Sequence, residues 1–207
     1  MFEVTILFEG YSGVEEGGRA MRANCTCTLV RGEGVTAVVD TRTAWDGEEI
    51  VEALRERGVE CGDVDVVVCT HGHSDHIGCN YLFKKAKHIV GQSISVGDRY
   101  ELHDFDAAGP YNLDGEKGRL RVVATPGHTL DSVSLIVDST KDGIVAIAGD
   151  TFEREEDLDD ASLWRDVAGS EDPKKQEQSR AKLMEIADVI VPGHGPMFKV
   201  PQRCKAK

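Results

Sequence analysis

A histidine-rich segment at residues 70–76 constrains this chain more than any other feature of its sequence. It reads T-H-G-H-S-D-H and places three imidazoles and a carboxylate within six residues. It directly follows residues 64–69, a short β-branched apolar run that predicts a buried strand. Crowded imidazoles need hydrogen-bond partners when neutral and repel one another when charged, whereas a divalent cation accepts a lone pair from each ring. The segment therefore predicts a metal site at the end of a buried strand.

Ligand-type residues also follow three further apolar runs. His128 comes after residues 119–124, Asp150 after residues 143–148, and His194 after residues 188–191. Glycine or proline at each junction permits a sharp turn, and ligand sites in α/β proteins lie off the carboxyl ends of strands. If the four ends converge, the combined donors are His71, His73, Asp75, His76, His128, Asp150 and His194. This set is too large for one tetrahedral ion and suits two metals that share a bridging ligand.

The bulk properties indicate one acidic domain. A chain of 207 residues is long enough for a single α/β domain over residues 1–207. Its formal net charge of -13 argues against broad, non-specific binding to nucleic acid or anionic membranes. No apolar run approaches the length of a membrane span, and the N-terminal residues lack the basic region of a signal peptide. We therefore expect six reduced cysteines and a cytoplasmic and/or nuclear location.

Hydrophobic patterning predicts two strand-then-helix halves, and hence two sheets flanked by helices. Strands are expected at residues 4–8, 25–30, 35–40, 64–69, 88–90, 119–124, 132–138, 143–148 and 188–191, with helices over 48–57, 76–83 and from 172 onward. Asp46 and Glu49 are expected to form a capping box at the first helix. Residues 10–18 resemble a mobile glycine-rich turn, and residues 91–118 resemble a loop or weak strands.

Several polar residues outside the donor set also need an interpretation. Asp40 ends a predicted strand, so it either orients a metal-bound histidine or belongs to a turn. His88 and His103 are interpreted as surface or strand residues. The cluster of Lys84, Lys85 and Lys87 is interpreted as a solvated helix end. The acidic residues 153–160 either overhang the site or form a solvated loop.

The four motifs T-H-G-H-S-D-H, T-P-G-H, A-G-D and P-G-H-G, in this order, resemble the metallo-β-lactamase-fold superfamily of hydrolases. The resemblance implies an α/β fold, a four-layer αββα sandwich in one domain. It also implies a zinc ion held by His71, His73 and His128, a second held by Asp75, His76 and His194, and Asp150 as the bridge. Many zinc β-lactamases carry a cysteine at the position of Asp150, which argues against lactam hydrolysis as the natural role.

A closer resemblance, to one group within this superfamily, is carried by residues 149–154, 170–180 and 187–196. This resemblance implies endonucleolytic processing of histone pre-mRNA 3′ ends. The leading hypothesis is thus a two-zinc endoribonuclease in which Asp75 orients the attacking water and carries its proton. Because the chain is acidic, a partner protein is expected to deliver the RNA; a second copy of the chain, in a homodimer, is a further candidate partner. The alternatives are a glyoxalase II-like thioester hydrolase, a persulfide dioxygenase with one iron, and a non-catalytic metal-binding module.

Overall fold

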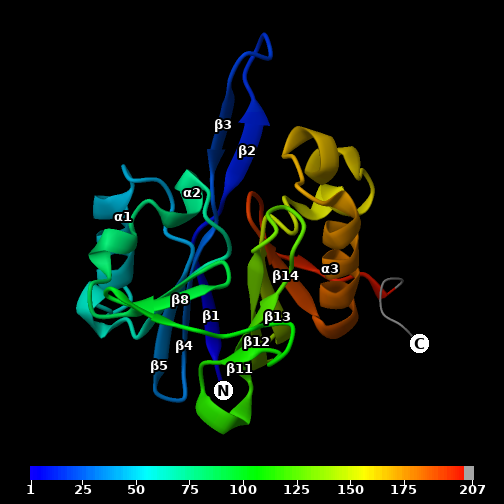
Figure 1. Cartoon of the computed structure of the whole chain (residues 1–207). Coiled ribbons are helices and arrows are strands. Elements are labelled where there is room, and N and C mark those ends of the chain that lie inside the picture. Colours follow the sequence, from blue (N-terminus) through cyan, green and yellow to red (C-terminus); the bar gives the residue numbers. More distant parts are fainter. Residues whose placement is uncertain (203–207) are drawn as a thin grey trace.

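Two β-sheets packed face to face form the centre of the protein, whose computed structural model describes residues 1–202 (Figure 1). Within this range the first sheet has the order β1-β4-β5-β6-β7-β8-β9. Its strands are β1 (Glu3–Phe8), β4 (Cys27–Gly32), β5 (Val35–Val39), β6 (Val66–Cys69), β7 (Lys87–Val90), β8 (Ser93–Val96) and β9 (Arg99–Glu101). The second sheet has the order β10-β11-β12-β13-β14-β15. Its strands are β10 (Tyr111–Asn112), β11 (Leu120–Ala124), β12 (Val133–Thr140), β13 (Gly143–Gly149), β14 (Val189–Pro192) and β15 (Phe198–Lys199).

Alternation along the strands builds the core between the sheets. In β6, Val68 faces the second sheet and belongs to the same buried cluster as Leu135 and Ile147. Its neighbour Val67 faces the opposite side and packs with Leu54 of α1 (Gly47–Arg55). Burial on both faces requires helices outside each sheet, which explains why the apolar run is nearly continuous.

The outer face of the second sheet is covered by α3 (Pro173–Ile186), so the layers follow the order αββα (Figure 1). Asp172 caps α3 as its sequence predicts, because its side chain accepts a hydrogen bond from the backbone N–H of Lys175. Leu183 on α3 packs against the outer face of the sheet. The predicted four-layer sandwich is confirmed. None of the helices in residues 1–202 has the length and apolar content needed to cross a membrane.

Asp46 does not cap α1 with its side chain, contrary to the prediction. Its backbone lies outside the extended region that a capping residue normally adopts. One carboxylate oxygen instead accepts hydrogen bonds from the backbone N–H of Thr43 and from the side-chain amide of Asn24, both at 2.9 Å. Asp46 therefore connects the start of α1 to the preceding loop and to the end of β3 (Met21–Asn24).

Residues 10–18 are not a simple turn. They belong to a two-stranded hairpin of β2 (Tyr11–Val14) and β3 (Met21–Asn24), which projects from the body of the molecule (Figure 1). The expected helix over residues 76–83 is also wrong in its bounds. The chain forms a single turn, α2 (Ser74–Ile77), and then a 3-10 turn over Asn80–Leu82. Residues 91–118 contain the short strands β8, β9 and β10, in agreement with the expectation of weak strands.

Candidate metal centre

The residues predicted to bind metal come from separate strand ends and meet at one edge of the two sheets. Strand β6 is parallel to β5 and leads to the histidine-rich segment. Strand β13 is parallel to β14, and these strands lead to Asp150 and His194. Parallel neighbours end at the same edge of a sheet, so the topology brings ligand residues together that are more than a hundred residues apart in sequence. His128 reaches the same place from the loop after β11.

Tight turns allow these ends to approach one another. Gly149 has a φ of 50°, and a Cβ atom there would lie 2.2 Å from the hydroxyl of Thr70. At Gly193 a Cβ atom would lie 2.0 Å from a carboxylate oxygen of Asp150. Any larger residue at either position would displace the side chains of the cluster.

The first group of donor atoms comes from His71, His73, His128 and Asp150, with all four atoms within 4.8 Å of one another. Nε2 of His71 lies 2.8 Å from Nδ1 of His73, and Nε2 of His128 lies 3.1 Å from the same atom. Three imidazoles thus direct ring nitrogens at a common point. His73 is exposed whereas His71 and His128 are buried, so the site opens to solvent on the side of His73.

The second group contains Asp75, His76 and His194, again within 4.8 Å. Oδ2 of Asp75 lies 3.7 Å from Nε2 of His194 and 4.0 Å from Nε2 of His76. His76 and His194 are buried, and the side chain of Asp75 remains 18% exposed. Asp75 therefore stands between the buried donors and the open side of the site.

Asp150 lies between the two groups. Its Oδ2 is 3.4 Å from Nε2 of His128 and 3.3 Å from Nε2 of His194, while its Oδ1 is 3.2 Å from Nε2 of His76. A single carboxylate thus contacts donors of both groups, as a bridging ligand must.

Hydrogen bonds on the far side of the rings fix their orientation. Nδ1 of His128 donates to the backbone carbonyl of Gly169 at 3.0 Å, and Nδ1 of His76 lies 3.0 Å from the carboxylate of Asp40. Nδ1 of His194 is 3.1 Å from two backbone carbonyls, those of Tyr11 and Asn24. Each contact leaves Nε2 free to bind a cation, an arrangement typical of metal-binding histidines. Of the two interpretations of Asp40, the structure supports the one in which it orients a histidine.

Several residues outside the predicted donor set support the cluster. The Thr70 hydroxyl contacts both carboxylate oxygens of Asp40 and lies 3.2 Å from Nδ1 of His71. The side-chain amide of Gln176 donates to the backbone carbonyl of Asp150 at 2.9 Å. Glu153 is buried, and its carboxylate groups with Asp150 and His194. Glu153 and Gln176 lie in the segments 149–154 and 170–180 that carry the closer resemblance, but their contacts with the site depend on the fold.

The electrostatics of the cluster fit a bound cation. Burial alone would raise the pKa of Asp150, but His76 and His194 outweigh it and hold that pKa well below its ordinary value. Burial would lower the pKa of His76, but the carboxylates of Asp150 and Asp40 hold it well above its ordinary value. The buried carboxylate thus attracts positive charge, which protons on the rings or a metal can supply.

Buried polar atoms without a hydrogen-bond partner also indicate a bound cation. Nε2 of His76 and Oδ1 of Asp150 are buried without a hydrogen bond, although the two atoms are 3.2 Å apart. Buried groups without a partner are costly, and a shared metal ion would satisfy both atoms. The residues present therefore fit a metal ion in each group. His88 and His103 lie outside the cluster, where each contacts a backbone carbonyl, that of Phe83 or Gly109.

The acidic residues 153–160 do not form a uniform charged rim. Glu153 and Asp157 are buried, and only Glu155, Glu156, Asp159 and Asp160 are exposed. Asp157 forms an ion pair with Arg180 at 3.2 Å. In the predicted cluster of three lysines, Lys84 and Lys85 are exposed and Lys87 forms an ion pair with Glu101.

Sequence and structure comparisons agree with this fold. The model of the metallo-beta-lactamase superfamily matches residues 21–194, and the chain belongs to this superfamily. Metallo-beta-lactamase domain-containing protein 1 of Xenopus laevis is 46% identical over 197 residues, which is 95% of this chain and 81% of the relative. A hydroxyacylglutathione hydrolase of Methylococcus capsulatus is 35% identical over 58% of this chain and 44% of its own length. A crystal structure of a Thermotoga maritima protein described as a metallo-beta-lactamase shares the fold, with a TM-score of 0.66 at 20% identity, covering 96% of this chain and 99% of that one.

Membership of the superfamily supports a metal-dependent hydrolase with a His/Asp metal-binding cluster.

Proposed function

We propose that this protein is a two-zinc hydrolase that cleaves RNA phosphodiester bonds. The observation that carries the proposal is the arrangement of seven donors in two groups that share Asp150. One ion would be held by His71, His73 and His128, the other by Asp75, His76 and His194, with Asp150 shared. When bound, the two ions would lower the pKa of water at the site and stabilise negative charge on the oxygens of the substrate.

Asp75 has a second role in this proposal. Its partly exposed carboxylate lies at the open side of the cluster, where it can orient the attacking water and accept its proton. The exposed His73 ring lies on the same side, so the substrate would approach from this direction. The buried donors, by contrast, are held rigidly by their hydrogen bonds to Asp40, Gly169 and the hairpin.

RNA as the substrate is supported by the resemblance of residues 149–154, 170–180 and 187–196 to proteins that process histone pre-mRNA 3′ ends. The carboxylate at position 150, in place of a thiolate, also favours a role other than lactam hydrolysis. Because the whole chain carries a formal charge of -13, we propose that a partner protein delivers the RNA to the site.

A glyoxalase II-like thioester hydrolase is the second candidate. It is favoured by one specific observation, the similarity to the hydroxyacylglutathione hydrolase of Methylococcus capsulatus. A thioester carbonyl can be attacked by the same water, and the leaving thiolate would need no general acid. This candidate requires no partner protein and no contact with phosphates.

Two measurements separate these proposals. Elemental analysis of protein made in metal-replete conditions should find about two zinc ions per chain. A single redox-active iron would instead favour the persulfide dioxygenase alternative. The zinc-loaded protein should then be assayed with a single-stranded RNA and with an S-acyl glutathione, each beside Asp150→Asn. Cleavage of RNA alone supports the leading proposal, and hydrolysis of the thioester alone supports the second.

A further inference from the structure

The base of the β2–β3 hairpin is joined directly to the loop that carries His194. The backbone N–H of Thr26 donates to the carbonyl of Gly193 at 2.7 Å, and its hydroxyl lies 3.5 Å from the carbonyl of Gly195. Between these two contacts, the ring of His194 faces the carbonyls of Tyr11 and Asn24. The first and last residues of the hairpin ladder therefore hold a metal ligand in place.

At Ser12, the residue after Tyr11, polar contacts join the hairpin to the segment after Asp150. The Ser12 hydroxyl donates to Oε2 of Glu153 at 3.3 Å and accepts from Nη2 of Arg154 at 2.5 Å. The same guanidinium nitrogen donates to the backbone carbonyl of Ser12 at 3.3 Å. We call these three residues the Ser12 clasp. Because Glu153 is buried, the clasp anchors the hairpin to the interior of the protein.

Beyond the clasp, part of β3 lies beside α2. In the outer part of the hairpin, Arg22 forms an ion pair with Glu15 at 2.9 Å. A two-stranded hairpin without further support is only marginally stable in water. The orientation of its outer part consequently depends on the base, on the neighbouring α2 and on the Ser12 clasp.

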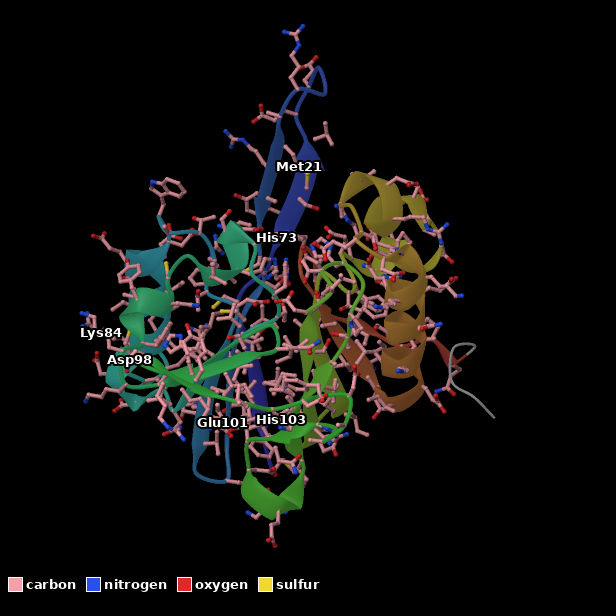
Figure 2. The ribbon with its side chains drawn as sticks, in the orientation of Figure 1. Met21, His73, Lys84, Asp98, Glu101 and His103 are labelled. Carbon is pink, nitrogen blue, oxygen red and sulfur yellow. The ribbon has the colours of Figure 1, made fainter. Side chains whose placement is uncertain are left out.

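The register of the hairpin decides which residues share a face with the clasp. Ser12 pairs with Ala23, and Val14 pairs with Met21, so these four side chains lie on one face of the ribbon. Val14 is 56% exposed and Met21 44% exposed, and this face carries no charged side chain. Figure 2 shows Met21 on the hairpin and His73, the exposed ligand of the cluster, near its base. Ser12 of the clasp and the apolar residues Val14 and Met21 therefore share one face of a hairpin whose base lies near His73.

We propose that Ser12 and Arg154 are positioning residues, which hold the β2–β3 hairpin in its projecting orientation and thereby set the affinity for substrate. Neither residue contacts the reacting atoms in this proposal. The effect on affinity rests on the hydrolase function proposed above, whereas the effect on the hairpin does not. The hairpin would present the apolar face of Val14 and Met21 to the substrate as it enters.

The test compares four single variants with the wild type. Ser12→Ala removes the hydroxyl, Ser12→Thr retains it, and Arg154→Gln removes the charged donor. Arg22→Gln is the matched control, because it breaks an exposed ion pair within the same hairpin and leaves the clasp intact. Amide hydrogen exchange over residues 10–14 and 23–26 is measured by mass spectrometry, together with the zinc content.

Exchange over these residues should be at least about fivefold faster in Ser12→Ala and Arg154→Gln, and unchanged in Ser12→Thr and Arg22→Gln. In the hydrolysis assay, KM should rise about three- to tenfold in the first two variants, with kcat within about twofold and the zinc content unchanged. Unchanged exchange would refute the anchoring role, and faster exchange with an unchanged KM would refute the role in affinity. Loss of zinc with a fall in kcat would show that the clasp only supports His194. If the wild type hydrolyses no substrate, the proposed function fails while the exchange data still test the clasp.

Discussion

The carboxylate of Asp40 lies 3.0 Å from Nδ1 of His76, and both side chains are almost completely buried. The same carboxylate accepts a hydrogen bond from the backbone N–H of Thr70 at 2.7 Å. Asp40 thus ties the end of β5 to the segment that carries the ligands, and its φ of 56° is one of three positive values among non-glycine residues within the described range. A strained, buried carboxylate that orients a metal ligand is expected to be sensitive to substitution.

Asp40→Asn should weaken metal binding about 10- to 100-fold, because the amide replaces an acceptor with a donor opposite the Nδ1–H of His76. Competition with a chelator measures the change. Asp65→Asn is the matched control. Asp65 also accepts a backbone N–H, that of Thr36, but it is exposed and lies just before β6, at the end of that strand opposite the ligands. Equal metal affinity in Asp40→Asn and the wild type would show that His76 is oriented by other contacts.

Asp150→Asn and His128→Ala should each lower kcat by at least about a hundredfold while the fold is retained. Asp150 contacts donors of both groups, so its amide variant should also bind less metal, whereas His128→Ala should affect mainly the first group. Steady-state kinetics, circular dichroism and metal analysis report these three properties separately. An Asp150→Asn protein with normal kcat would mean that the shared ligand is misassigned.

Arg180→Gln should destabilise the protein by about 3–5 kcal/mol, because it leaves the carboxylate of Asp157 buried without its cation. Arg180 also lies over the ring of Phe152, with 4.1 Å from its guanidinium carbon to the ring centroid. Chemical denaturation measures the free energy of unfolding. Lys182→Gln, on an exposed position of the same helix, should change it by less than about 0.5 kcal/mol.

The loss caused by Arg180→Gln should depend on pH. Burial raises the pKa of Asp157, and the charge of Arg180 opposes this rise. Without Arg180 the carboxyl takes up a proton at higher pH, so the folded variant binds more protons than the folded wild type. The destabilisation should therefore be greatest near neutral pH and shrink as the pH falls through the raised pKa. A loss that is constant between pH 4 and 8 would show that packing on Phe152, not charge, accounts for it.

RNA binding by the isolated, zinc-loaded chain should be weak and only slightly dependent on salt. Two zinc ions carry more positive charge than Asp75 and Asp150 together carry negative charge, so a phosphate is attracted at the centre while the acidic surface repels the rest of the strand. One to three phosphate contacts predict a slope of about -0.7 to -2 in log K against log salt. The measurement uses a phosphorothioate single-stranded RNA that resists cleavage. A steeper slope would reveal a basic groove.

Deletion of residues 155–160 would not be a clean test of the acidic segment. The sequence left open whether residues 153–160 overhang the site or form a solvated loop. The structure places Asp157 inside the protein, where it pairs with Arg180 and accepts a hydrogen bond from the backbone N–H of Glu153. Substitution of the exposed Glu155 and Glu156 by glutamine tests the same idea without breaking a buried ion pair.

The sequence by itself determined the fold class and the candidate ligands. Each candidate ligand comes soon after a short apolar run, and the ends of parallel strands meet at one edge of a sheet. The cap of α3 was predictable for a similar reason, because Asp172 bonds to a backbone N–H only three residues away. Signals of this kind depend on neighbours in the chain, so composition and spacing are sufficient to detect them.

Only the tertiary structure decided what surrounds the ligands. The acceptors for His128 and His194 are backbone carbonyls, of Gly169, Tyr11 and Asn24, and every residue has such a carbonyl whatever its side chain. The hairpin was missed because residues 10–18 lack the alternation that marks a strand with one buried face. The sequence left residues 153–160 as either a rim over the site or a solvated loop. It did not predict that Glu153 and Asp157 are buried, because their partners, Ser12 and Arg180, lie 141 and 23 residues away. Contacts between distant segments form only when the chain is folded, so a local sequence pattern does not predict them.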